Sequence, residues 1–488
     1  MSEAHEKPGN DTSDEASPAR PERQVQTSHT TTIEGQAIAY TATAGTLNLE
    51  DAKHADRASV FYVAYVKDGV DDPSTRPVTF CFNGGPGSSA VWLQLGAFGP
   101  RRVEMSDAAA PLPPPYDLVD NAFGLLDLTD LVFVDPVGTG FSRPVGKAKG
   151  EEFHSVKGDV ESVGAFIAKW ISRYARWNSP RFLAGESYGT TRAAGLVHHL
   201  QERGIVCNGL VLLGLALDFT TFVFEPGNDL PNVLYLPTYA ATSWYHDRLD
   251  ERPPDLHDFL EEVREFAVET YAPALLRGAG LPADRKHALA QRLAAYTGLP
   301  AGEIEARDLR IEYLWYAKRV LGEPGRTVGR LDSRFVGIDP DTHHPRATSD
   351  PSFDAPIGPY SALINDHLRR HLGWESDDEY EVLSIAVNEA WKWDQDAHMG
   401  FPHVVQDLRR ALLANPHLKV LVASGLYDLA TPFFASAYTV DHLDVDESLR
   451  ANVRLCWYEA GHLMYVHPPS LAKLRADLKG WYADALGR

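Results

Sequence analysis

The sequence predicts an α/β protein with a mostly parallel central sheet, flanked by helices and interrupted by a helical insertion. Short apolar runs rich in Val, Leu and Phe alternate with segments whose apolar residues recur at helical spacing, which is the pattern of βαβ units. Between about residues 219 and 399 this alternation stops. Helix-like blocks there are followed by a segment, 329–360, that Pro, Asp and Gly punctuate every few residues, so we expect it to be an irregular loop.

Seven apolar runs are the predicted strands of the sheet. Several are almost continuously apolar, as expected of central strands that are buried on both faces. The runs are 59–66, 78–82, 131–135, 181–185, 209–217, 418–425 and 453–460. Apolar residues at helical spacing predict a helix between 155 and 177.

The strands and the insertion divide the chain into four parts. Residues 1–27 are polar and rich in Pro, Ser and acidic side chains, which predicts a disordered tail. The other parts are a first core segment (28–218), a helical lid insertion (219–399) and a second core segment (400–488).

Composition and charge exclude some partners. The chain has 488 residues, of which 44% are hydrophobic, and a formal net charge of −21. Its acidic residues are scattered and no basic stripe is present, so its field repels a phosphate backbone and we expect no nucleic-acid partner. No run of 18 consecutive apolar residues occurs, so we expect no membrane span.

The cysteines and the N-terminus predict a cytoplasmic protein. Cys81, Cys207 and Cys456 each lie in a separate apolar run, which is typical of buried reduced thiols. Their spacing matches no metal motif, and we expect no metal and no cofactor. The N-terminal residues lack the apolar stretch of a secretory signal.

The motif Gly-Glu-Ser-Tyr-Gly at residues 185–189 predicts a nucleophile. It follows an apolar strand and precedes a run that can be helical. A nucleophile elbow turns sharply at this point and needs glycine on both sides of the serine, because larger side chains would collide with neighbouring strands. We therefore predict Ser187 as the nucleophile. The alternative is a glycine-rich turn in which Ser187 only caps the following helix.

Two further residues complete a catalytic triad. A serine nucleophile needs a base and a carboxylate, which in α/β-hydrolases follow it at the ends of later strands. Asp428 comes just after the run 418–425, and His462 just after 453–460. Taken singly, Asp428 could be a turn or capping residue and His462 a loop histidine. The competing residues lie in later helical or loop segments: Asp441, Asp444 and His467.

The stretch Asn-Gly-Gly-Pro-Gly at residues 83–87 predicts an oxyanion loop. An acyl-transfer site needs N–H donors, one from the residue after the nucleophile and one from a glycine-rich loop after an earlier strand. Bare backbone lets such N–H groups approach a substrate carbonyl. The alternative is a plain Gly-Pro turn.

Together these motifs resemble the serine carboxypeptidase family, over nearly the whole chain after about residue 30. The stretches that carry the resemblance are NGGPGSS, VDPVGTGFS, GESYG, SGLYDLATP and AGH, in this order. The resemblance implies the α/β-hydrolase fold and a carboxypeptidase that releases C-terminal residues from peptides through an acyl-enzyme. It implies Ser187, Asp428 and His462 as the triad.

The resemblance also implies roles for four other residues. Gly85 and Tyr188 would be the oxyanion donors, and Asn83 and Glu186 would bind the terminal carboxylate of a peptide. Two carboxylates in contact are not both ionised cheaply, so Glu186 and the substrate would share a proton. Binding of peptide acids would then weaken as the pH rises.

The sequence departs from the family pattern at three places. Ser88 stands where the family has a disulfide-bonded cysteine, which is consistent with a reducing compartment. Asp135 adjoins Pro136 where the family has a glutamine, and Ala97 replaces a second carboxylate-binding glutamate. The last change leaves endopeptidase, esterase, amidase or acyltransferase activity open. A non-catalytic peptide-binding protein would need a broken triad, whereas all three triad residues are present.

Overall fold

A ten-stranded sheet forms the centre of the computed structural model, which describes residues 21–106, 109–393, 397–398 and 400–487. In spatial order its strands are β1 (Gln24–Ile33), β2 (Gln36–Glu50), β3 (Asp56–Lys67), β7 (Asp130–Val134), β4 (Val78–Phe82), β9 (Arg181–Glu186), β10 (Gly209–Leu213), β15 (Lys419–Gly425) and β16 (Val453–Tyr458), and β8 (Arg143–Pro144) pairs with β3. From β7 to β16 neighbouring strands are parallel, whereas β1, β2, β3 and β7 are antiparallel. The parallel strands bring their carboxyl ends to one edge.

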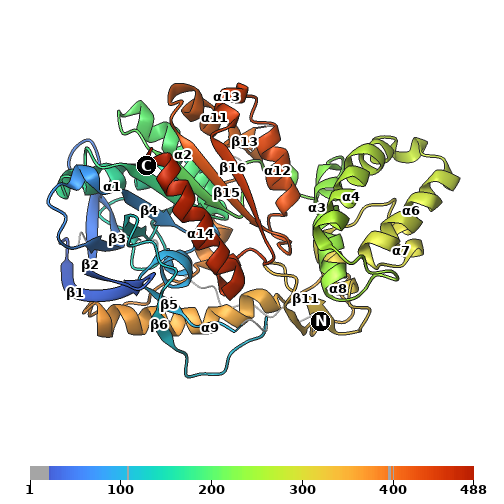
Figure 1. The fold of residues 1–488 in the computed structure, drawn as a ribbon, viewed down its shortest axis with the longest axis horizontal. Coiled ribbons are helices and arrows are strands. Elements are labelled where there is room, and N and C mark those ends of the chain that lie inside the picture. The colour runs from blue at the N-terminus through green and yellow to red at the C-terminus, as the bar shows by residue number, and fades with distance from the viewer. Residues whose placement is uncertain (1–20, 107–108, 394–396, 399, 488) are drawn as a thin grey trace, which may run out of the picture.

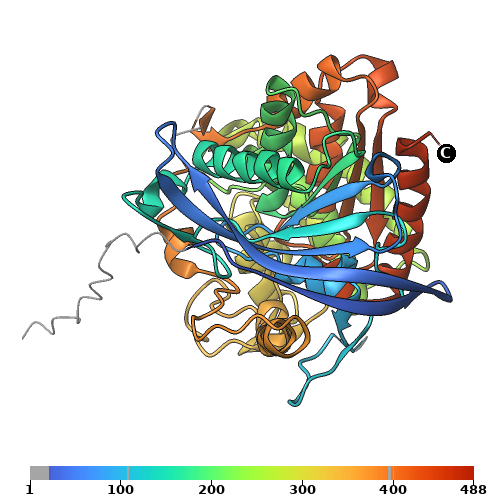
Figure 2. The ribbon, with the colours of Figure 1, turned by 90° about the vertical axis from the view of Figure 1, so that its left-hand side faces the viewer.

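Helices cover both faces of the sheet. Helices α1 (Val156–Arg173), α2 (Tyr188–Glu202) and α11 (Val405–Ala414) pack on one face, and α14 (Pro468–Ala485) packs on the other. Figure 2 shows α1 and α14 on opposite sides of the twisted strands. Strand β4 shows how both faces of the sheet are buried. Phe80 faces Trp170 of α1, with ring centroids 5.4 Å apart, whereas Cys81 belongs to the core under α14. Alternation of side chains along a strand places neighbours on opposite faces.

The structure contains every strand that the sequence predicts, but the sequence analysis missed the hairpin β1–β2. The prediction of a disordered tail is wrong for residues 24–27, because they pair with β2 in the register Gln24 to Gly45. Strand β1 is polar and leaves alternate side chains exposed, so its composition resembles that of a tail. Its threonines favour strands when a partner is available. Residues 1–20 lie outside the described residues.

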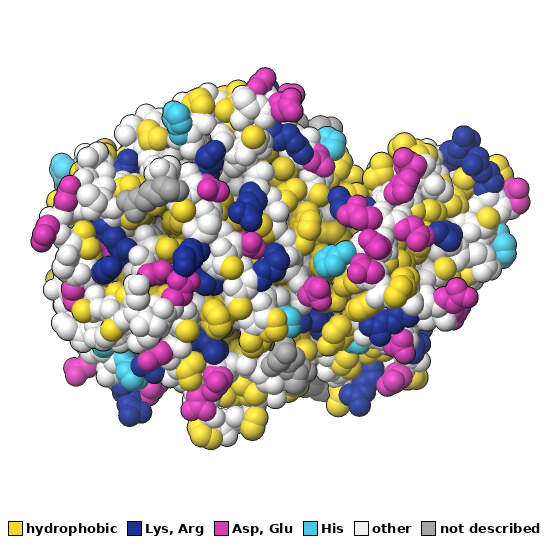
Figure 3. Space-filling view, in the orientation of Figure 1, with side chains coloured by type: hydrophobic (Ala, Val, Ile, Leu, Met, Phe, Trp, Pro, Cys, Tyr) yellow, Lys and Arg dark blue, Asp and Glu magenta, His cyan; other side chains and the backbone are white. Residues whose placement is uncertain are grey.

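The residues predicted as a lid separate into two regions. The first is a helical lobe beside the α/β body in Figure 1, composed of α3 (Leu230–Tyr245), α4 (Leu256–Phe266), α5 (Ala272–Leu275), α6 (Ala283–Thr297), α7 (Ala301–Ala306) and α8 (Tyr313–Arg319). The lobe has its own apolar core, which continues onto α12 (Phe433–Asp441) of the body. Figure 3 shows a hollow between lobe and body, with hydrophobic side chains gathered along it.

The second region returns to the α/β body. Part of it is helical, so the expectation of an irregular loop over 329–360 was wrong for that part. Residues 351–366 form helix α9 (Pro351–Asp366), which runs along the α/β body in Figure 1. Asp350 caps it by accepting a hydrogen bond from the Ser352 N–H, and a proline at the first position is compatible with a helix start. Tyr360 packs on Trp92 with ring centroids 4.7 Å apart. This packing outweighs the two prolines inside the helix, which misled the sequence analysis.

The other elements of the described chain are short. They are β5 (Arg101–Val103), β6 (Leu118–Asp120), β11 (Arg326–Val328), β12 (Val336–Ile338), α10 (Ile385–Glu389), β13 (Ala397–His398), β14 (Phe401–Pro402) and α13 (Glu447–Arg450). Within the residues described, none of the helices is both long and apolar enough to cross a bilayer.

The three cysteines are unpaired and buried, as predicted. Cys81, Cys207 and Cys456 expose 0%, 3% and 6% of their surface. Burial raises the pKa of each thiol, which makes the reactive thiolate scarce.

We therefore expect a thiol reductant to change neither the melting temperature nor the activity. A thiol-titrating reagent should react with the cysteines only after denaturation. A fall in melting temperature on adding reductant would contradict this prediction, because it would require a disulfide within the protein.

Candidate active site

Ser187 lies at a sharp turn between β9 and α2, as the sequence predicts. Its backbone has φ 59° and ψ −128°, in the positive-φ region that residues other than glycine rarely adopt. The neighbouring glycines are required sterically. A Cβ on Gly185 would lie 2.1 Å from the carbonyl oxygen of Gly189, and one on Gly189 would lie 2.7 Å from that of Phe82. The strained turn presents the Ser187 hydroxyl at the carboxyl edge of the sheet.

Asp428 and His462 meet at the same edge. Asp428 follows β15 and His462 follows β16, and the His462 Nδ1 lies 2.6 Å from the Asp428 Oδ2. Both side chains are buried. The Asp428 carboxylate also accepts hydrogen bonds from the N–H groups of Ala430 (2.7 Å) and Thr431 (2.9 Å) and from the Thr431 hydroxyl (2.8 Å). A carboxylate held in this way fixes the orientation and the tautomer of the imidazole.

The imidazole of His462 lies next to the nucleophile elbow. The Ser187 N–H donates to the Leu213 carbonyl at 2.8 Å, and a Cβ on the next residue, Gly214, would lie 2.7 Å from the His462 Cε1. Burial lowers the pKa of His462, but the charge and hydrogen bond of Asp428 outweigh this effect, and the pKa is raised overall. The structure therefore brings all three predicted triad residues to the end of β10.

The three competing residues have other partners. Asp441 pairs with Arg450, and Asp444 lies 3.1 Å from Arg409. The His467 Nδ1 is 2.7 Å from the Ser470 hydroxyl at the start of α14. These contacts account for the three residues without a catalytic role.

The glycine loop 83–87 lies directly against the elbow. A Cβ on Gly84 would come within 2.4 Å of the Tyr188 nitrogen, so only glycine fits there. Gly85 has φ +104°, a conformation that also favours glycine. Gly85, Ser187 and Tyr188 line one cavity. This is the arrangement that two backbone oxyanion donors require.

Hydrogen bonds anchor this loop where the family pattern has a disulfide. The Ser88 hydroxyl donates to the Val382 carbonyl at 3.2 Å and accepts a hydrogen bond from the Trp92 indole at 2.9 Å. The Ser384 N–H donates to the Gly87 carbonyl at 2.8 Å. Residues 382–384 are thus fixed to the oxyanion loop without a covalent bond.

Asn83 and Glu186 lie close to the triad but are buried, with 1% and 3% of their surface exposed. The Asn83 Oδ1 accepts a hydrogen bond from the Leu93 N–H at 3.1 Å, and the Asn83 side chain lies close enough to Glu186 to lower the pKa of that carboxyl. The Glu186 carboxylate accepts a hydrogen bond from the Tyr465 hydroxyl at 2.8 Å. Burial raises the pKa of Glu186 to about 7, although the nearby His462 opposes this shift. Neither residue is among those that line the cavity.

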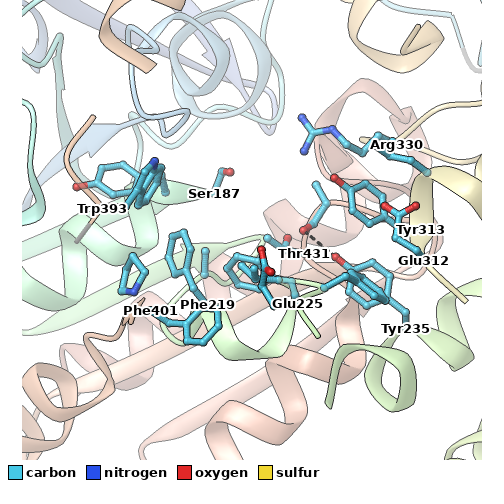
Figure 4. Close-up of a pocket in the computed structure, with 18 of the residues that line it drawn as sticks. Ser187, Phe219, Glu225, Tyr235, Glu312, Tyr313, Arg330, Trp393, Phe401 and Thr431 are labelled. Carbon is cyan, nitrogen blue, oxygen red and sulfur yellow. Dashed lines mark hydrogen bonds between the residues drawn. The ribbon is translucent and has the colours of Figure 1, made fainter. Parts of the chain in front are cut away.

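The cavity beside Ser187 has a volume of about 700 Å³, and its walls contain many aromatic side chains. In Figure 4, Trp393, Phe401 and Phe219 lie on one side of it, and Tyr235, Tyr313, Glu312 and Arg330 lie on the other. Its remaining lining residues include Ala216, Phe222, Val223, Phe224, Glu225, Leu314, Arg346, Ala430 and Thr431. A cavity of this size and character suits an apolar substrate group with a few polar contacts.

No local sequence pattern indicates which residues of the lobe, or of the segment that connects it to the body, line the site. Arg330 lies in the segment expected to be an irregular loop, and its contacts depend on residues far away in the sequence. Thr431 could have been found, because it lies in the stretch SGLYDLATP beside Asp428. Tyr465 follows His462 by three residues, but its contact with Glu186 is not visible in any local pattern.

The fold and the site define the class of protein. The parallel strands, the elbow after β9 and the Asp and His at later strand ends are those of an α/β-hydrolase. A crystal structure of a prohormone-processing carboxypeptidase from Saccharomyces cerevisiae has this fold, with a TM-score of 0.57 and 17% identity over 91% of this chain and 92% of that chain.

The sequence comparisons find similarity to one family over part of the chain. Residues 35–215 match the family model for serine carboxypeptidase. Serine carboxypeptidase-like 7 of Arabidopsis thaliana is 27% identical over 154 residues, which is 31% of this chain and 34% of the relative. Serine carboxypeptidase S10 family member 1 of Dictyostelium discoideum is 24% identical over 163 residues, or 33% and 36% of the two chains. Over these residues the chain is similar to the serine carboxypeptidase family.

The matches cover only part of the proteins. The chain aligns with about a third of the length of these curated relatives. The residues matched by the family model include Asn83, Gly85, Glu186, Ser187 and Tyr188. Asp428 and His462 lie beyond that region, so their assignment depends on the geometry described above.

We expect the substitution Ser187→Ala to abolish hydrolysis while the protein stays folded. Alanine is small enough for the elbow, but it has no hydroxyl to attack a carbonyl, and turnover should fall by about 10⁶-fold. The measurement is steady-state kinetics, with thermal melting as the test of folding. Turnover close to that of the native protein would refute the assignment of the nucleophile.

The substitution Asp428→Asn should lower turnover by about 10⁴-fold with little change in KM, because the imidazole loses its charged partner and its preferred tautomer. Asp444→Asn is the matched control, since Asp444 is ion-paired with Arg409 and should leave turnover unchanged. If Asp444→Asn or Asp441→Asn abolished turnover and Asp428→Asn did not, we would have chosen the wrong acid.

Proposed function

We propose that the chain is a serine-type carboxypeptidase that releases C-terminal residues from peptides through an acyl-enzyme. The observation that carries this proposal is the buried hydrogen bond of 2.6 Å between Asp428 and His462, beside an elbow whose serine opens into the cavity. The match of residues 35–215 to the serine carboxypeptidase family model supports the same chemistry. A binding protein without activity would have no need for this charge-assisted pair.

The reaction follows from the positions of these groups. The Ser187 Oγ attacks the carbonyl carbon of the scissile bond while the His462 Nε2 accepts its proton. The imidazolium that forms is stabilised by Asp428, and the oxyanion by the N–H groups of Gly85 and Tyr188. The proton then passes from His462 to the leaving amine, and the acyl-enzyme remains. Water, deprotonated by His462, releases the acid in the second step.

We also propose a reducing, cytoplasmic location. The support is the set of three unpaired, buried cysteines and the hydrogen-bonded Ser88, which takes the position of a crosslinked cysteine in the family pattern.

A mixed peptide library tests the proposed function. Mass spectrometry of the products should show loss of single residues from the C-terminus. A fluorophosphonate probe should label Ser187 in the native protein and not in Ser187→Ala. Labelling without cleavage of any peptide would favour an esterase or an acyltransferase on the same triad. Absence of labelling would favour a protein without catalytic activity.

We expect a peptide acid to be preferred over its C-terminal amide, with a preference that decreases as the pH rises through about 7. Burial raises the pKa of Glu186 to about 7, so this carboxyl is mostly neutral below that pH and mostly ionised above it. The ionised form repels a nearby substrate carboxylate.

The measurement is the ratio of kcat/KM for acid and amide between pH 5.5 and 8.5. Glu186→Gln is neutral at every pH and should remove the decrease. If the native ratio equals one throughout, the protein is not a carboxypeptidase. If Glu186→Gln keeps the native pH dependence, Glu186 is not its source.

A further inference from the structure

Arg330 and Ser187 line the same cavity. In Figure 4 its side chain extends from the wall into the cavity, toward the side where Ser187 lies. Within the described chain its one ion pair joins Nε to the Asp350 Oδ2 at 3.6 Å, and its terminal nitrogens make no hydrogen bond. The side chain remains 42% exposed.

The backbone holds Arg330 between the two loops of the triad. The Leu429 N–H donates to the Arg330 carbonyl at 3.0 Å, directly after Asp428. The His462 N–H donates to the carbonyl of the next residue, Leu331, at 2.6 Å. Arg330 is therefore fixed relative to the catalytic groups. Consistent with this proximity, its charge opposes the raised pKa of His462.

Asp350 contacts the guanidinium of Arg330 at Nε alone, and its other carboxylate oxygen has different partners. The Asp350 Oδ1 accepts hydrogen bonds from the backbone N–H of Arg330 (3.0 Å), from the Ser352 N–H (3.1 Å) and from the Ser352 hydroxyl (2.5 Å). It thereby caps α9 and holds the backbone of Arg330. A guanidinium presents parallel N–H donors that match a carboxylate, and here the outer donors face the cavity.

The other arginine of the cavity has a closer ion pair. The Arg346 Nε lies 3.3 Å from the Glu312 Oε2, compared with 3.6 Å between Arg330 and Asp350, and its side chain is 54% exposed. Glu225 contributes a carboxylate to the same lining and so favours a substrate that also carries a positive charge. Arg330 is thus the better placed of the two arginines for an anionic group.

Buried side chains surround Glu186, the residue to which the family resemblance assigns a substrate carboxylate. Glu186 is hydrogen-bonded to Tyr465, and the ring of Tyr465 lies 2.4 Å from where a Cβ on Gly96 would be. The hydroxyl of Tyr360 lies 2.6 Å from the same point, and Ala97 supplies no polar group. These side chains are buried. Arg330 lines the cavity beside Ser187, whereas Glu186 does not.

We propose that Arg330 binds a carboxylate of the substrate, in place of the Asn83 and Glu186 pair. This inference rests on the proposed hydrolase function. The carboxylate is either the C-terminal carboxylate of the peptide or an acidic side chain next to the scissile bond. Arg330 is a specificity-determining residue in this scheme and takes no part in proton transfer.

The test compares matched substrates in four variants. The substrates are an N-blocked Phe-Leu acid, its C-terminal amide, and N-blocked Glu-Leu and Gln-Leu amides. The variants are Arg330→Met, which keeps the length of the side chain, Arg330→Lys, which keeps the charge without the fork, Arg346→Met as the matched control, and Asn83→Ala. Thermal melting verifies folding, and Arg330→Lys serves if Arg330→Met does not fold.

We expect Arg330→Met to reduce the preference for the carboxylate-bearing substrate by roughly 10- to 100-fold, mainly through KM, as for the loss of a hydrogen-bonded charged group. Arg330→Lys should reduce it less, and Arg346→Met and Asn83→Ala should leave it unchanged. A change in the acid-to-amide ratio identifies the terminal carboxylate as the ligand. A change in the Glu-to-Gln ratio identifies the side chain.

Two outcomes separate this inference from the proposed function. If Asn83→Ala removes the acid preference and Arg330→Met does not, Arg330 is not the carboxylate site, while the carboxypeptidase function stands. If the native protein is labelled by a fluorophosphonate but prefers neither peptide acids nor Glu-containing amides, both the carboxypeptidase function and the role of Arg330 are refuted.

Discussion

The hydrogen bond between Asp428 and His462 is the interaction on which the rest of the site depends. It is buried, and a carboxylate left there without partners would carry a large desolvation penalty. The donors from Ala430 and Thr431 give Asp428 further hydrogen bonds, so the buried carboxylate has partners without solvent. The imidazole is then held with Nδ1 as the donor, which leaves Nε2 to accept the proton of the nucleophile.

The segment that connects the helical lobe to the α/β body helps to hold the triad loops in place. Residues 330–334 run between the loop of Asp428 and the loop of His462, and they bond to both. Besides the bonds of Arg330 and Leu331, the Ser333 N–H donates to the Tyr427 carbonyl at 2.9 Å, and the Gly461 N–H donates to the Asp332 carboxylate at 3.0 Å. Displacement of this segment would therefore disturb both triad loops at once.

The parts of the fold that follow local rules were predictable, and those set by distant contacts were not. The strand runs and the elbow glycines carry their own signals, and the triad follows from strand ends that parallel pairing brings to one edge. Strand β1 and helix α9 were missed because a polar composition and several prolines disguise segments that pairing and packing stabilise. Arg330 and Tyr465 carry no local signal, since their roles arise from residues far away in the chain.

A guanidinium binds a substrate carboxylate over a wider pH range than a pair of carboxyl groups does. A neutral carboxyl such as Glu186 can donate to a substrate carboxylate only while it keeps its proton, and its pKa of about 7 limits this to acidic and neutral solution. An arginine stays charged over the whole range. The proposed carboxylate binding by Arg330 would therefore persist at a pH where Glu186 has lost its proton, and Glu186 would only modulate it.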